Sequence, residues 1–154
     1  MRPSAMRAQP GFATRARESF ARQTARATRA ARFGRVAAGE VDVLTDHGAD
    51  LTQQHGFLHA GVVASALDSA CGCAALTLMP AGAAVPTIEF RINLLAPALR
   101  PRFRFESHVA KAGRTISVVE GRALQFDVDG GDEVPVATMT ATMMTVVGRD
   151  ELRE

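Results

Sequence analysis

Residues 53–75 read QQHGFLHAGVVASALDSACGCAA, a turn rich in His and Gly followed by an apolar segment with almost no charge. We expect this segment to form a helix over residues 59–78, with about 30 Å of rise. Apolar side chains cover most of its circumference, and a helix that is apolar nearly all round is buried. The rest of the fold must therefore enclose this helix.

Four small or polar residues interrupt the apolar surface of the helix: Gly61, Ser65, Asp68 and Gly72. Their spacing places them on one face as a narrow stripe, which could admit a second helix or a ligand at close range. Asp68 is the only acid in this helix, and a buried acid without a partner costs several kcal/mol. We therefore expect Asp68 to have a buried partner or a chemical role. Its position at mid-span also argues against a membrane-spanning helix.

The composition is that of one soluble globular domain. The chain has 154 residues, of which 47% are hydrophobic and 22% charged, and this size supports a single core. The charge is uneven, because residues 1–35 contain nine arginines and one glutamate whereas the remainder is net negative. Pro and Gly residues predict a disordered basic leader over residues 1–13, before a single domain over residues 14–154.

The basic N-terminal segment has three interpretations. We favour a surface helix over residues 15–32 with a solvated arginine face; a transit peptide and a nucleic-acid-binding arm are the alternatives. The chain lacks Trp and Tyr, so an aromatic stacking surface for nucleic acid is not expected. The N-terminus also lacks the apolar segment typical of a secretory signal peptide. We expect neither a nucleic acid nor a membrane as a partner.

The two cysteines, Cys71 and Cys73, lie two positions apart on the predicted helix. Side chains at this spacing point away from each other, so the pair predicts neither a disulfide nor a shared metal ion. We expect both to pack in the core of a protein from a reducing compartment, the cytoplasm. Neither a metal nor a cofactor is expected.

Further elements lie on both sides of the long helix. Before it we expect a helix that Thr14 caps and that ends near Ala31, then a hairpin with strands over residues 33–36 and 40–44. After it, alternating and β-branched patterns predict four strands in an antiparallel meander, over residues 87–94, 102–110, 115–127 and 134–147. This order predicts an α+β fold, in which a curved antiparallel sheet of five or six strands wraps around one long central helix.

Three separate segments also resemble one family. The first runs from HGFLHAG at residues 55–61 to DSACGCAA at residues 68–75; the others are TIEFRINLLAPA at 87–98 and KAGRT at 111–115. These motifs resemble the hotdog-fold acyl-CoA thioesterases, specifically the phenylacetate-degradation (PaaI-type) group. The resemblance implies the hotdog architecture and hydrolysis of an acyl-CoA thioester to a carboxylic acid and coenzyme A. It also implies a homodimer that assembles into a homotetramer.

The resemblance assigns roles to residues of this chain. Asp68 matches the family's catalytic carboxylate, as general base or nucleophile, and Gln53 matches an amide that orients water or that carboxylate. Thr87 matches a hydroxyl near the thioester in some members. Ala60 stands where the family often has a Gly whose backbone N–H binds the thioester oxygen, and Gly61 keeps the helix start open. Candidate substrate contacts are His59, Ser65, Thr115 and, for a phosphate of coenzyme A, Arg114.

Helix geometry indicates that two copies share the site. Asp68 lies eight residues after Ala60, about 12 Å along the helix axis, so one chain cannot present both groups to one carbonyl. Two helices packed antiparallel across a two-fold axis would place Asp68 of one subunit beside Ala60 and Gln53 of the other.

Other interpretations stay open from sequence alone. Asp68 could be a structural acid, Gln53 a loop cap, and His59 a side chain that bonds backbone groups. Two other functions fit the fold: a non-catalytic acyl-CoA-binding protein, and a dehydratase or hydratase, which would need a His base placed with Asp. The acyl group, aryl or alkyl, is not determined.

Overall fold

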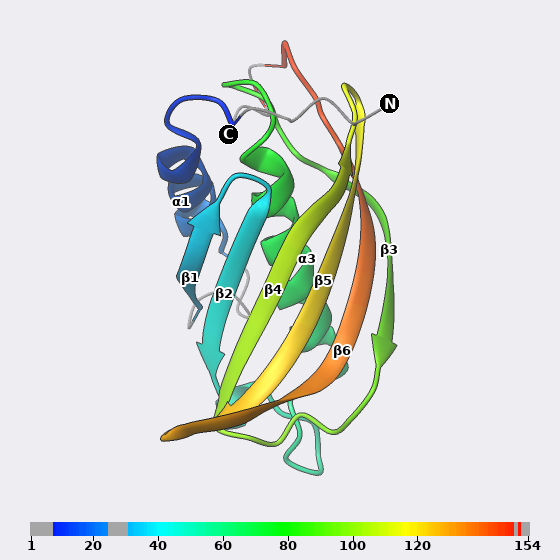
Figure 1. Ribbon diagram of the computed structural model, residues 1–154. Coiled ribbons are helices and arrows are strands. Elements are labelled where there is room, and N and C mark those ends of the chain that lie inside the picture. The colour runs from blue at the N-terminus through cyan, green and yellow to red at the C-terminus, as the bar shows by residue number, and fades with distance from the viewer. Residues whose placement is uncertain (1–7, 25–30, 150, 152–154) are drawn as a thin grey trace.

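The computed structural model describes residues 8–24, 31–149 and 151, and it shows one antiparallel sheet curved around a central helix (Figure 1). The helices are α1 (Phe12–Arg22), α3 (Ala60–Leu76) and the short 3₁₀ helix η1 (Ala49–Leu51). The strands are β1 (Arg32–Ala37), β2 (Glu40–Asp46), β3 (Thr87–Leu94), β4 (Arg102–Ala112), β5 (Ile116–Asp127) and β6 (Gly130–Met144). The predicted α+β class and hotdog architecture are confirmed.

The inner face of the sheet packs on α3 because buried residues alternate with outward-facing ones along the strands. In β4, Phe103 and Phe105 are fully buried, whereas Arg104 between them lies on the outer face. At Gly121 of β5 the helix comes very close, since a Cβ there would lie 3.0 Å from Cys71 Sγ and 3.2 Å from Leu67 Cδ2. The helix begins and ends within two residues of its predicted bounds.

Both cysteines, Cys71 and Cys73, are buried thiols in the core, as predicted. Burial, together with the negative charge of nearby Asp68, raises the pKa of the Cys71 thiol to about 12, so this thiol stays protonated at neutral pH. Both side chains pack in the hydrophobic core. The location of the protein in the cytoplasm stays a prediction. Within the described part of the chain, no helix is both long enough and apolar enough to cross a membrane.

The strand order, β1-β2-β4-β5-β6-β3, corrects the predicted meander. β3 does not pair with β4 but lies at the edge beside β6. Residues 95–101 connect β3 to β4 across one end of the sheet (Figure 1). The Gln125 side chain holds this crossover, because its Oε1 accepts from Leu99 N–H (2.9 Å) and Arg100 N–H (3.1 Å), and its Nε2 donates to the Pro97 carbonyl. A tight hairpin between β3 and β4 is thereby excluded.

The N-terminal helix is shorter than predicted. It starts at Phe12 after Gly11, whose φ of 73° suits glycine, so the predicted cap at Thr14 is wrong. It ends at Arg22, not near residue 31, because the backbone of Gln23 is extended (φ −69°, ψ 122°); Phe20, near its end, contacts the Phe33 ring of β1 at 4.4 Å between centroids. Residues 1–7 and 25–30 lie outside the described residues, and the predicted disorder of the leader stays a prediction.

Candidate active site

Asp68 and Thr87 meet where α3 passes the start of β3. The stripe predicted on α3 faces away from the sheet, with Gly61 and Ser65 exposed and Asp68 and Gly72 half-buried. The Thr87 hydroxyl donates to Asp68 Oδ1 at 2.7 Å. Among the described residues, Asp68 forms no ion pair with a cation. Within the described ranges, the carboxylate is therefore held by a neutral donor rather than by a cation.

A cavity of about 440 Å³, here called the Asp68 cavity, opens beside this pair. Ser65, Asp68 and Gly72 of the α3 stripe line it, with Thr87 on one side and with α1 and the two residues that follow α1 on the other. A Cβ added to Gly72 would meet nothing within 4 Å, so this glycine leaves open space beside Asp68. The cavity can therefore hold a ligand against the carboxylate.

The start of α3 carries the second part of the predicted site. His59 caps the helix, because its Nδ1 accepts from Gly61 N–H at 2.9 Å. The N–H of Ala60, in contrast, has no hydrogen-bond partner among the described residues. Of the two backbone donors predicted to polarise a thioester, Ala60 N–H is thus the one left free, at the positive end of the helix dipole.

Gln53 and Ala60 line a separate cavity of about 200 Å³, here called the Ala60 cavity. Its other walls are apolar, with Leu58, Val63 and Leu94 among them. The Gln53 side chain accepts from the N–H of His55, the loop-capping interaction expected of a structural role. One chain therefore brings Asp68 and Thr87 together in one cavity, and Gln53 and Ala60 together in another.

The remaining candidates lie apart from one another. The Ser65 hydroxyl lines the Asp68 cavity but donates to the Gly61 carbonyl within its own helix, at 2.8 Å. Arg114 and Thr115 lie in the β4–β5 hairpin, and Arg114 lines a third cavity of about 300 Å³ with Met79. No group of three or more His, Cys, Asp or Glu side chains in the described ranges could hold a metal ion.

Sequence reasoning missed the contribution of α1 and of Gln23, the residue that follows it. Ser19 and Gln23 line the Asp68 cavity, and the Ser69 hydroxyl donates to Gln23 Oε1 at 2.9 Å. Ser69 follows the predicted catalytic residue directly, and this adjacency was the one available signal. Nothing in the sequence connects it with Gln23, because the two residues are far apart along the chain.

Comparison with known proteins decides the family. The model of the thioesterase superfamily matches residues 55–129. The crystal structure of a thioesterase family protein from Silicibacter pomeroyi is 49% identical and has a TM-score of 0.85, covering 90% of this chain and 100% of that one. This chain belongs to the thioesterase superfamily. The predicted family is confirmed, and membership supports the predicted class of enzyme, a hydrolase of thioester bonds.

Other similar proteins are more distant or match only in part. A presumed esterase of Saccharolobus solfataricus is 40% identical over 82 residues, 53% of this chain, and the match spans only 56% of that relative. The PaaI protein of the E. coli phenylacetic acid degradation operon is 16% identical, with a TM-score of 0.76 over 89% of this chain and 94% of that one. A hypothetical thioesterase from Streptococcus pneumoniae, solved with coenzyme A, is 21% identical, with a TM-score of 0.66 over 77% of this chain and 88% of that one. These two structures show the shared fold alone.

Proposed function

We propose that this chain hydrolyses acyl-CoA thioesters in active sites shared between two subunits. The observation that carries the proposal is the separation of the predicted groups into two cavities of one chain. Asp68 with Thr87 lies in one, and Gln53 with Ala60 in the other. Eight residues of α3 separate Asp68 from Ala60, about 12 Å of rise. The superfamily supports thioester hydrolysis, and the coenzyme A in the Streptococcus pneumoniae relative supports acyl-CoA as the substrate.

In the proposed mechanism the free N–H of Ala60 binds the thioester oxygen and stabilises the negative charge that develops on it. Asp68 of the other subunit acts as general base on a water, or attacks the carbonyl carbon itself. With Asp68 as base, water adds to the carbonyl carbon as Asp68 takes its proton, the carbon–sulfur bond breaks, and the proton passes to the leaving thiolate. With Asp68 as nucleophile, breaking of the carbon–sulfur bond releases the thiolate and leaves a mixed anhydride on Asp68, which water hydrolyses in a second step to the carboxylic acid and the free Asp68 carboxylate. Thr87 orients the carboxylate through its hydrogen bond, and Gln53 orients the water.

The edge strand β3 supports the proposed dimer. Phe90 faces the same side as Ala141 of β6, toward the inner face, yet it is 45% exposed, and Ile88 and Leu94 are 51% and 56% exposed. Exposed apolar side chains on an unpaired edge are typical of an interface. Pairing of β3 with the same strand of a second copy would bring the two α3 helices side by side, antiparallel across the two-fold axis. A homotetramer would be a pair of such dimers.

Complementation between inactive variants tests the shared site. Asp68→Ala and Gln53→Ala chains are co-expressed with different affinity tags, and the heterodimer is purified through both tags. Each heterodimer carries one site with both lesions and one with neither, so it should recover about half of the activity of a wild-type dimer. Heterodimers as inactive as either parent would show that both residues serve one site from one chain. Binding of coenzyme A without any release of thiol from the wild-type protein would instead indicate a binding protein.

A further inference from the structure

We propose that Gln23, the residue directly after α1 in the wall of the Asp68 cavity, hydrogen-bonds the amide-bearing thiol arm of the substrate, the pantetheine part of coenzyme A. This inference rests on the proposed thioesterase function and names the part of the substrate that each cavity takes. A thioester has two arms that leave the reacting carbonyl in different directions. The proposed site likewise has two cavities, one beside each catalytic group.

The two cavities differ in polarity. Hydroxyl and amide side chains line much of the Asp68 cavity, including Gln23, Ser69 and Thr87. Apolar side chains line the Ala60 cavity except at Gln53. Hydroxyl and amide side chains offer hydrogen bonds to a polar ligand, and apolar walls favour hydrocarbon. An acyl hydrocarbon therefore fits the Ala60 cavity, whereas an arm with two amides fits the Asp68 cavity.

Gln23 has the hydrogen-bonding capacity that such an arm requires. Its Oε1 accepts from the Ser69 hydroxyl at 2.9 Å, which fixes the orientation of the side-chain amide. Its Nε2 has no partner among the described residues, so its two N–H donors are available. An amide carbonyl is an acceptor for such a donor. Ser69 thus positions Gln23, and Gln23 contacts the substrate.

The wall that carries Gln23 is fixed to the body of the protein. Arg15 of α1 donates to the carbonyls of Pro80 and Met79 at 3.0 and 3.2 Å, and Phe20 packs on Phe33. The helix also lies outside residues 55–129, which the superfamily model matches. We infer that Gln23, held in place by α1, supplies a substrate contact that lies outside the matched core of the superfamily.

The test compares two thioesters of the same acid, one with pantetheine and one with ethanethiol, which has no amide. The variant Gln23→Glu keeps an acceptor oxygen for Ser69 but removes both N–H donors, and Gln23→Ala removes the whole amide. Both should lower kcat/KM for the pantetheine thioester by about three- to tenfold, mainly through KM, which is the effect of one neutral hydrogen bond. Neither should change kcat/KM for the ethyl thioester. Thr14→Ala, at an exposed polar position of α1 that does not line the cavity, is the control and should change neither.

Equal loss on both thioesters would overturn the inference, because it would place the effect in the fold or at the acyl group. No loss on either would also overturn it. If the wild-type protein releases thiol from neither substrate, the proposed function fails. Calorimetric binding of free pantetheine then decides the inference independently, since Gln23→Glu must weaken that binding and Thr14→Ala must not.

Discussion

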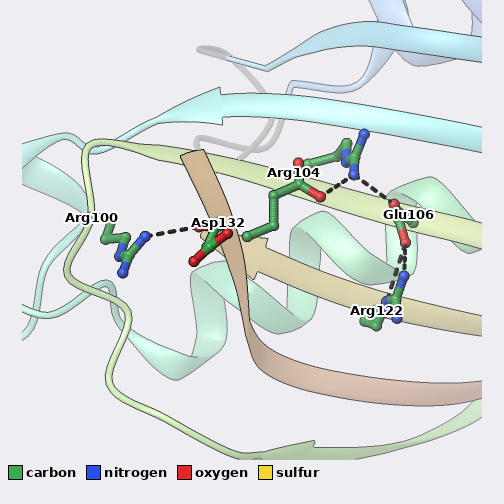
Figure 2. A network of polar contacts seen from close by, with 6 residues as sticks. Arg100, Arg104, Glu106, Arg122 and Asp132 are labelled. Atoms are coloured by element: carbon green, nitrogen blue, oxygen red, sulfur yellow. Dashed lines mark hydrogen bonds and ion pairs between the residues drawn. The ribbon is translucent and has the colours of Figure 1, made fainter. Parts of the chain in front are cut away.

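Glu106 and Asp68 lie on opposite sides of the sheet, and their carboxylates have different kinds of hydrogen-bond partner. Glu106, on the outer face of β4, accepts from Arg122 at 2.8 Å and lies 3.0 Å from Arg104, and Figure 2 shows it between the two guanidinium groups. Asp68, on α3, accepts from the neutral hydroxyl of Thr87 beside an open cavity. A carboxylate between two cations has its charge compensated, whereas one held by a single hydroxyl can still act on water or substrate.

The outer face continues this pattern beyond Glu106. Arg104 also pairs with Glu133, and Arg100 donates to the Asp132 carbonyl at 2.9 Å (Figure 2). These side chains are partly exposed, so each pair contributes at most about 1 kcal/mol to stability. The comparison teaches that the partners of a carboxylate, rather than its presence, separate a structural acid from a candidate catalytic one.

The largest expected effect is the loss of activity in Asp68→Ala. Removal of a positioned base or nucleophile should lower kcat by at least about 100-fold. The matched change on the outer face, Glu106→Gln, should leave kcat within twofold and lower the free energy of unfolding by no more than about 1 kcal/mol. Initial rates of thiol release and thermal melts measure both. Near wild-type turnover in Asp68→Ala, or an inactive but folded Glu106→Gln, would reverse the assignment of the two acids.

The next effect concerns the hydroxyl that holds Asp68. Thr87→Val removes the donor while keeping the shape, and the loss of a hydrogen bond to a charged group should lower kcat by about ten- to a hundredfold. Thr87→Ser should restore most of the activity. Thr142→Val is the control, because Thr142 Oγ1 also donates to a carboxylate, that of Glu89 at 3.3 Å, away from the cavity. Equal rates in Thr87→Val and Thr142→Val would show that Thr87 does not position the catalytic group.

The contrast between regions also explains what the sequence could predict. The bounds of α3 follow from its own composition, because a helix buried on most sides needs apolar residues throughout. The stripe and its acid follow from spacing along one helix. The contact of Asp68 with Thr87 required the position of β3, and Gln125 fixes that position by holding the β3–β4 crossover. A clamp between distant residues leaves no periodic signal in the sequence.

The misjudged end of α1 has a related cause. The Ala- and Arg-rich segment has high helix propensity beyond Arg22, but Gln23 is extended (φ −69°, ψ 122°), and the buried residues of α1 itself are Ala16, Ser19 and Phe20. Helices in proteins persist mainly where they pack. The exposure of Ile88 and Phe90 was equally hidden, because their alternation predicts a buried face and only the edge position of β3 leaves that face uncovered.

Alanine at two glycines, Gly121 on β5 facing α3 and Gly72 on the opposite face of α3, should have smaller effects on stability, and the two effects should be opposite in sign. Gly121→Ala would place its Cβ 3.0 Å from Cys71 Sγ, and such overpacking should cost about 1–3 kcal/mol of stability. Gly72→Ala meets no atom within 4 Å and replaces a helical glycine, so it should stabilise by up to about 1 kcal/mol. The same methyl group narrows the Asp68 cavity and should raise KM. Melting temperatures that move in the same direction for both variants would contradict this description of α3.

The smallest expected effect is the pH dependence that Asp42 adds on the outer face. Burial raises the pKa of Asp42 above its ordinary value of 3.8, and the neighbouring charge of Glu106 adds to this, against the lowering effects of Arg104 and Arg35. The folded chain therefore holds this proton more tightly than the unfolded chain, so stability falls as the pH rises from 3.8 through the raised pKa.

Asp42→Asn should remove that fall. Compared with wild type, the variant should therefore have a higher melting temperature at pH 7 relative to its own melting temperature at pH 4. Glu106→Gln should produce part of the same shift, because it removes the second cause while leaving the burial of Asp42. A pH dependence identical in wild type and Asp42→Asn would show that the folded chain does not hold the Asp42 proton more tightly than the unfolded chain. The outer face would then stabilise the charge of Asp42 as it does that of Glu106.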